Sequence, residues 1–117
     1  MQRTLAIAVL GLLADSQAWA ETAYFAAGVV RTLIDSEFYG GCMAQLDTSP
    51  SDVLEGCNRS WISFSCSGDF NPSEVGYRKL EAAQLALVTG ARITVIIDNT
   101  KLHNGYCFAR RLDNLSP

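Results

Sequence analysis

The chain has 117 residues, a formal net charge of -3 and a hydrophobic fraction of 49%. A domain of this size has one small core. Its acidic balance argues against nucleic acid as a partner, because no Lys or Arg cluster is larger than Arg110-Arg111. After residue 20 no apolar run is long enough to span a membrane, so we expect no membrane insertion.

Residues 1–20 have the pattern of a secretory signal peptide. Arg3 precedes an uncharged apolar run, and the small residues Ala18 and Ala20 favour cleavage before Glu21. The run is shorter than the roughly 20 residues that a membrane span needs. We therefore predict a leader at 1–20, one domain at 21–117, and a secreted or periplasmic location.

Four cysteines lie beyond the leader: Cys42, Cys57, Cys66 and Cys107. An even number of cysteines in an oxidising compartment points to two disulfides. A zinc site is the alternative, but no pair has CxxC spacing and His103 is the only histidine. We predict disulfides, no metal site and no cofactor.

Three strand patterns follow the leader. After a short apolar lead-in at 21–27, residues 28–35, 42–47 and 61–66 alternate with a period of two, and a long polar loop at 48–60 precedes the third pattern. One face of the second and third patterns is apolar: Cys42, Ala44, Leu46, Ile62, Phe64 and Cys66. The other face of the third pattern carries Trp61, Ser63 and Ser65.

A helix with marked ends comes next. Asn71 is placed to cap the free amides, Pro72 suits the first helical position and Glu74 suits a capping box. Gly90 suits the left-handed residue that ends a helix. Small and apolar residues repeat between these signals at helical spacing: Gly76, Leu80, Ala83 and Leu87.

Two further strands complete the chain. Residues 91–98 alternate, residues 99–104 are a polar turn closed by Gly105, and residues 106–112 alternate again. The predicted order is three strands, one helix and two strands. This is the order of an OB-fold, a five-stranded, partly closed barrel with its helix between the third and fourth strands. An open sheet with the helix across one face is the alternative.

The barrel predicts which cysteines meet. Antiparallel pairing of the second and third strands sets Cys42 opposite Cys66 across the ladder. Cys57 then meets Cys107, near the start of the fifth strand, because that strand runs beside the third in an OB barrel.

The chain has little sign of catalysis, and we predict that it is not an enzyme. His103 lies in the polar turn, where we interpret it as a solvated residue rather than a general base. No Ser or Cys has a partner that would make it a nucleophile.

Aromatic residues are the best binding candidates. Trp61 shares its face with Ser63, away from the expected core, so its ring is predicted to lie at the surface beside that hydroxyl. Tyr39, next to two glycines, is a second candidate. Exposed rings stack on sugars or fill a pocket of a partner. The alternative is a Trp61 ring folded over the end of the barrel.

The run KLEAAQLALVTGARITVII at 79–97 resembles the helix, Thr-Gly and strand of the subtilase cytotoxin B-subunit group. These are OB-fold B subunits of bacterial AB-type toxins. The resemblance implies a homo-pentamer, a ring of five subunits that pair their strands at the edges, line a channel with their helices and bind glycans. No residue of that group's glycan site matches a position here.

Together these patterns predict a secreted or periplasmic, non-catalytic binding module that recognises a glycan or a protein surface and is similar to a toxin B subunit. The alternative is a monomeric periplasmic structural or inhibitor-like protein that acts through its loops at 48–60 and 99–104. A hydrolase is the third hypothesis.

Overall fold

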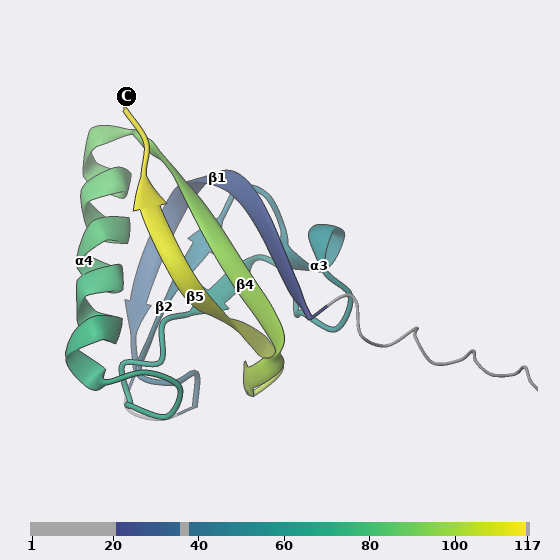
Figure 1. The fold of residues 1–117 in the computed structure, drawn as a ribbon. Coiled ribbons are helices and arrows are strands. Elements are labelled where there is room, and N and C mark those ends of the chain that lie inside the picture. The colour runs from purple at the N-terminus through teal and green to yellow at the C-terminus, as the bar shows by residue number, and fades with distance from the viewer. Residues whose placement is uncertain (1–20, 36–37, 117) are drawn as a thin grey trace, which may run out of the picture.

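The computed structural model describes residues 21–35 and 38–116 (Figure 1). The leader predicted at 1–20 lies outside the described residues. The described chain is mostly β with one long helix, as expected. Its elements are β1 (Thr22–Ile34), β2 (Cys42–Leu46), α3 (Pro50–Val53), β3 (Trp61–Ser63), α4 (Ser73–Thr89), β4 (Arg92–His103) and β5 (Tyr106–Asn114).

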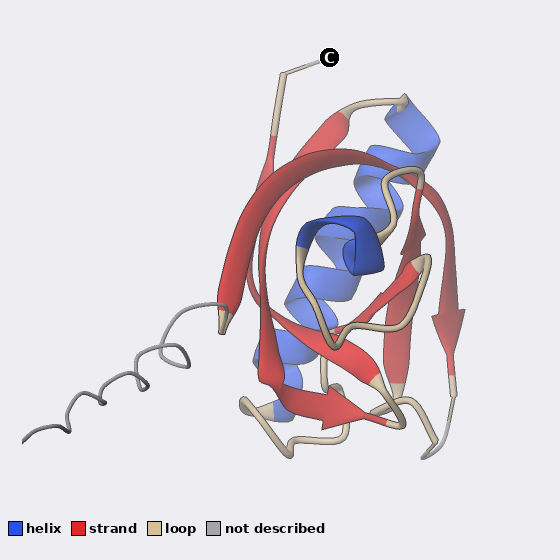
Figure 2. Ribbon diagram, turned by 90° about the vertical axis from the view of Figure 1, so that its right-hand side faces the viewer, coloured by secondary structure: helices blue, strands red, loops and turns tan. Residues whose placement is uncertain are grey.

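The five strands form one mixed sheet that closes on itself in the order β1-β2-β3-β5-β4. The ring closes because β4 pairs with β1 as well as with β5. Its narrowest pairing is the parallel one between β3 and β5, at Ser63 and Phe108. Figure 2 shows the strands curving around the interior with α4 behind them. The strands thus form a ring rather than the open sheet considered as the alternative.

Two strands are longer than their sequence patterns. Residues 22–27 of the apolar lead-in belong to β1, which pairs with β4 over 22–28 and with β2 from Val29 onward, with a bulge between Val29 and Arg31. The bulge bends the strand just after it changes partners. The polar residues 99–103 belong to β4, so the predicted turn is reduced to Asn104 and Gly105. Both have positive φ, as a two-residue hairpin turn requires.

Strand β3 is shorter than predicted, and its register differs from the predicted one. Ala44 pairs with Ile62, and the Phe64 N–H donates to the Cys42 carbonyl at 3.1 Å, so Cys42 lies across from Phe64 rather than Cys66. A shift of two residues keeps every side chain on its predicted face. The backbone then turns at Ser65, where φ is 55°.

Two disulfides join the predicted partners. Cys66 returns to Cys42 after the turn, with a Cα–Cα distance of 5.6 Å. Cys57 and Cys107 are joined with a Cα–Cα distance of 5.2 Å. The pairing expected from the strand order is therefore present, although the first disulfide forms beyond the end of the β2–β3 ladder and not within it.

The core fills the ring and is closed on one side by α4. Its largest fully buried side chains are apolar and come from β3, the residue after it, and β4: Ile62, Phe64, Ile93, Val95 and Ile97. Helix α4 approaches closely because Gly76 has no Cβ. A Cβ there would lie 2.8 Å from the Phe64 carbonyl oxygen. Leu87, in the predicted apolar repeat, is 37% exposed, and Ala86 is buried in its place.

The C-terminal end of α4 agrees with the sequence-based prediction, and the N-terminal end does not. Gly90 ends the helix in the left-handed conformation, and its N–H donates to the Ala86 carbonyl, as expected. At the other end Pro72 occupies the cap position and no side chain caps the helix. The predicted role of Asn71 as a capping residue is therefore wrong, because its side chain is used elsewhere. Within 21–35 and 38–116, no helix is long and apolar enough to cross a membrane.

Candidate functional site

A hollow of about 150 Å³ opens on the outer side of the ring. Five residues line it: Leu33, Tyr39, Met43, Trp61 and Tyr106. They come from the end of β1, the β1–β2 loop, β2, β3 and the start of β5. Two of the three predicted binding residues, Trp61 and Tyr39, are therefore brought together, and the sheet adds a third aromatic ring.

Trp61 forms one wall of the hollow and is half-buried. The guanidinium carbon of Arg31 lies 5.1 Å from the centroid of its ring, which is cation–π geometry. The Arg31 Nε–H donates to the Gln45 side-chain oxygen at 3.0 Å. The ladder pairs Gln45 with both Arg31 and Trp61, so three strands fix this row of side chains.

Tyr39 and Tyr106 also line the hollow. Their rings meet edge to face, with centroids 5.5 Å apart and an interplanar angle of 84°. The Tyr39 N–H donates to an Asp35 carboxylate oxygen at 3.0 Å, which holds the loop to the end of β1. Phe38 lies beside Tyr39, with ring centroids 6.4 Å apart, and is 69% exposed.

Ser63 was predicted to face the surface beside Trp61, and this prediction is wrong. The side chain is fully buried because the β1–β2 loop covers the outer face of β3. Its hydroxyl donates to the Tyr39 carbonyl at 2.7 Å and accepts the Ser65 N–H at 3.2 Å. Ser63 therefore supports the Tyr39 loop from below and does not line the hollow.

The structure also pairs Ser65 with His103, which sequence reasoning missed. The Ser65 hydroxyl oxygen lies 3.0 Å from His103 Nε2 and accepts the Phe70 N–H at 3.0 Å. His103 is the last residue of β4, and its side chain is only 10% exposed. The interpretation of His103 as a solvated turn residue is therefore wrong.

The geometry of this pair differs from that of a catalytic triad. An Asp69 carboxylate oxygen lies 3.9 Å from the same nitrogen, Nε2, that contacts Ser65. In a triad the carboxylate holds the other ring nitrogen and the serine is accessible, whereas Ser65 is fully buried. Burial lowers the pKa of His103, and the Asp69 charge opposes that shift.

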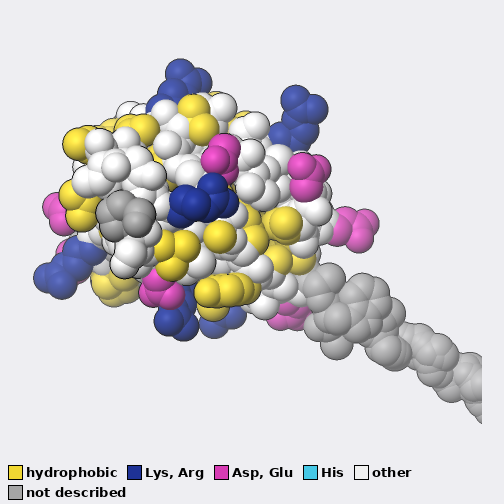
Figure 3. All heavy atoms as spheres, turned by 90° about the horizontal axis from the view of Figure 1, so that it is seen from above, with side chains coloured by type: hydrophobic (Ala, Val, Ile, Leu, Met, Phe, Trp, Pro, Cys, Tyr) yellow, Lys and Arg dark blue, Asp and Glu magenta, His cyan; other side chains and the backbone are white. Residues whose placement is uncertain are grey.

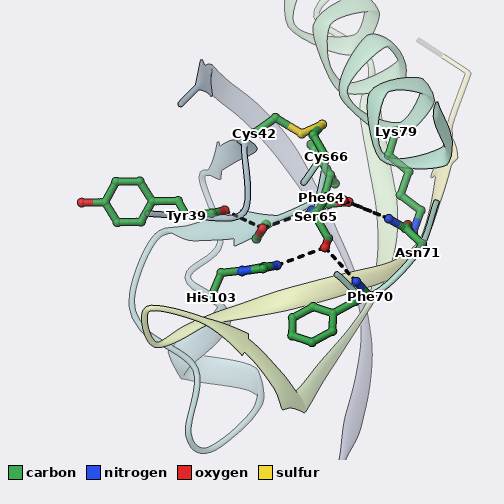
Figure 4. Close-up of a disulfide and its surroundings, with 10 residues drawn as sticks. Tyr39, Cys42, Phe64, Ser65, Cys66, Phe70, Asn71, Lys79 and His103 are labelled. Atoms are coloured by element: carbon green, nitrogen blue, oxygen red, sulfur yellow. Dashed lines mark hydrogen bonds between the residues drawn. A yellow bond between two sulfur atoms is a disulfide. The ribbon is translucent and has the colours of Figure 1, made fainter. Parts of the chain in front are cut away.

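Asn71 and Lys79 complete the polar cluster drawn in Figure 4. The Asn71 amide donates to the carbonyls of Phe64 and Ser65, each at 3.2 Å, and its oxygen accepts from Lys79 Nζ at 2.7 Å. Lys79 also donates to the Ala109 carbonyl at 2.9 Å. Burial lowers the pKa of Lys79 to about 8. Asn71 therefore binds the irregular chain after β3 instead of capping α4.

In the part of the chain that the structure describes, no three His, Cys, Asp or Glu side chains come together in a way that could hold a metal ion. No protein-family model, curated protein or solved structure matches the chain. The relation to toxin B subunits therefore stays a prediction, and the function has to be argued from the hollow itself.

Proposed function

We propose that this chain is an exported, disulfide-bonded OB-fold module that binds a glycan or a protein surface through the aromatic hollow and performs no catalysis. The ring order β1-β2-β3-β5-β4, with α4 between β3 and β4, supports the OB-fold assignment. The two disulfides support export, because such bonds persist in oxidising compartments.

The position of the hollow is the observation that carries the proposal. OB-fold domains bind oligosaccharides and oligonucleotides on the face of their second and third strands, between the β1–β2 and β4–β5 loops. The hollow has Met43 from β2 and Trp61 from β3 on its surface, with Tyr39 from the first of those loops and Tyr106 from just after the second.

The charge and size of the site favour a small uncharged group over nucleic acid. The net charge is -3, and none of the five residues that line the hollow is charged. Figure 3 shows the molecule from above, away from the hollow, and there charged side chains of both signs are scattered among apolar ones. A volume of about 150 Å³ is below the roughly 300–1,000 Å³ of sites for drug-sized ligands. The hollow therefore fits one sugar ring, or one side chain of a partner, at a time.

A glycan array tests the proposal. We expect binding by the wild-type protein and a loss of at least about tenfold for Trp61→Ala, because an aromatic contact of this kind is worth about 1.4 kcal/mol. Tyr24→Ala is the matched control, since Tyr24 is 65% exposed and lies outside the hollow. Equal binding by Trp61→Ala and wild type would remove the hollow from the site.

The toxin-like form of the proposal adds a ring of five subunits, and native mass measurement tests it. A mass of five chains together with glycan binding supports this form, and a monomer that binds no sugar removes it. Genes beside this one add a separate test, because a toxin B subunit has a secreted catalytic partner.

A protein partner is the second candidate, and exposed Phe38 favours it, because this large ring lies beside the hollow and extends its apolar surface. The monomeric structural or inhibitor-like alternative retains only the loop at 48–60, since residues 99–103 are strand. Co-purification from the native host with wild type and Phe38→Ser separates these versions, because only a partner of the hollow is lost with the variant.

A further inference from the structure

His103 lies directly behind the two tyrosines of the hollow. It pairs with Tyr106 across the β4–β5 hairpin. Its ring also packs against Gly40, the residue after Tyr39, so closely that a Cβ on Gly40 would lie 2.4 Å from the imidazole Cδ2. Gly40 has a φ of +80°, which a glycine adopts without strain. The histidine thus contacts both segments that carry the tyrosines, the β1–β2 loop with Tyr39 and β5 with Tyr106.

Hydrogen bonds make a second connection between His103 and Tyr39. His103 Nε2 contacts the Ser65 hydroxyl, the Ser65 N–H donates to the Ser63 hydroxyl, and that hydroxyl donates to the Tyr39 carbonyl. Figure 4 shows this series, with the Tyr39 carbonyl turned into the cluster and its ring turned away. Both serine side chains are fully buried, so water does not compete for these bonds.

The series is satisfied when His103 is neutral. We assign the neutral tautomer with its hydrogen on Nδ1: Nε2 then accepts the Ser65 hydroxyl proton, and the Ser65 oxygen accepts the Phe70 N–H. A protonated imidazole carries a hydrogen on Nε2 as well, so the Ser65 hydroxyl has to accept at that position and turn its own proton elsewhere. In a buried cluster, a donor without an acceptor is unfavourable.

Burial and the Asp69 charge shift the pKa of His103 in opposite directions. Among the described residues, the charged side chain that contacts the ring is that of Asp69, on the loop after β3. Its Oδ2 lies 3.9 Å from His103 Nε2. The other described groups that surround the imidazole are uncharged. Gly40 comes from the β1–β2 loop, Ser65 and Phe70 come from the loop that also carries Asp69, and Tyr106 comes from β5. Burial lowers the pKa of His103 more than Asp69 raises it.

We propose that His103 is the positioning residue of the aromatic hollow, and that it holds Tyr39 and Tyr106 in place only in its neutral form. Acidification then opens the hollow and releases whatever occupies it. The release of a ligand rests on the proposed function. The movement of the two tyrosines does not, because it is measured without any ligand.

An NMR titration of the purified chain from pH 8 to pH 4.5 tests the inference. His103 is the only histidine, so its imidazole signal reports its own midpoint, which we expect below 6.5. The ring signals of Tyr39 and Tyr106 are expected to shift with that same midpoint, while Tyr24 and Tyr77, outside the hollow, stay unchanged. Titration of His103 without movement of Tyr39 and Tyr106 overturns the inference, and so does a simultaneous shift of all the tyrosines.

Two variants sharpen the test. His103→Gln carries a polar group near the place of Nε2 and does not titrate, so the tyrosine signals should keep their neutral positions at every pH. Asp69→Asn changes an exposed side chain and removes the charge that raises the histidine pKa. It should lower the His103 midpoint and the tyrosine midpoint by the same amount. A tyrosine midpoint that stays in place in Asp69→Asn contradicts the proposal, even if His103→Gln does not fold.

The outcomes for the two proposals are separable. A binding screen that identifies no ligand removes the proposed function but does not affect the pH-dependent movement of the tyrosines. A ligand found in the absence of the transition removes only the role of His103.

Discussion

The two sides of the ring are held together by different means. On one side β1, β4 and β5 pair over long stretches, and α4 packs on them through small residues. On the other side β3 has three residues, and the chain from 64 to 72 is held by a disulfide and by side-chain hydrogen bonds. Both sides contribute to the core, and the irregular side also supports the hollow.

Removing a disulfide gives the largest expected effect. The bonds join residues 50 and 24 positions apart, for Cys57–Cys107 and Cys42–Cys66 respectively. Chain entropy predicts losses of about 4 and about 3.5 kcal/mol in the free energy of unfolding. Denaturant unfolding of the two double alanine variants measures them. Cys42→Ala/Cys66→Ala is expected to shift the Tyr39 signals as well, since Cys42 begins the strand after the Tyr39 loop. Losses below about 1 kcal/mol would contradict a role for the disulfides in stabilising so small a core.

Gly76→Ala comes next and tests the packing between the two sides. In an exposed helix this change stabilises by about 1 kcal/mol, but here the new Cβ would meet the backbone of Phe64 and Cys66. We expect a loss of about 1–3 kcal/mol from overpacking. Gly28→Ala is the control, because its Cβ would meet only the end of the Asp47 side chain, which can move. A stabilised Gly76→Ala protein would contradict the close approach of α4.

The sequence predicted the regular side better than the irregular side. Alternation located β2, β4 and β5, and the Gly90 signal located the end of α4. An alternating sequence pattern does not show that a strand changes its pairing partner, so the extension of β1 toward Thr22, where it pairs with β4, was not predicted. Ser63 alternates like a surface residue, but a loop distant from it in sequence covers it. Ser65 and His103 are 38 positions apart, and no local pattern marks them as a pair.

Asn71→Ala is expected to have an intermediate effect confined to the irregular side. It removes the donor to the carbonyls of Phe64 and Ser65 and one of the two acceptors of the Lys79 amine, which costs about 2 kcal/mol in a partly buried place. Asn114→Ala removes an exposed bond to the Ala82 carbonyl on the regular side and should cost less than about 0.5 kcal/mol. Equal losses in thermal or denaturant unfolding would remove the distinction between the two sides.

Lys79 gives the smallest effect. Its folded pKa of about 8 is below the ordinary lysine value of 10.5, so between these values the unfolded chain binds more protons at this side chain than the folded one. The contribution of Lys79 to the free energy of unfolding therefore rises with pH across that window. NMR of the lysine side chains measures it, with Lys101 as the internal control because the chain has only these two lysines. A Lys79 midpoint near 10.5 would show that the amine is solvated.

The central claim is that the hollow between the β1–β2 loop and the β4–β5 turn is where this protein binds. Chemical-shift mapping with a panel of mono- and oligosaccharides and of aromatic and aliphatic peptides tests it most directly. The account predicts saturable shifts that are largest at the Trp61 indole and the Tyr39 and Tyr106 rings. Saturable shifts centred on the exposed face of α4, or none with any member of the panel, would contradict it.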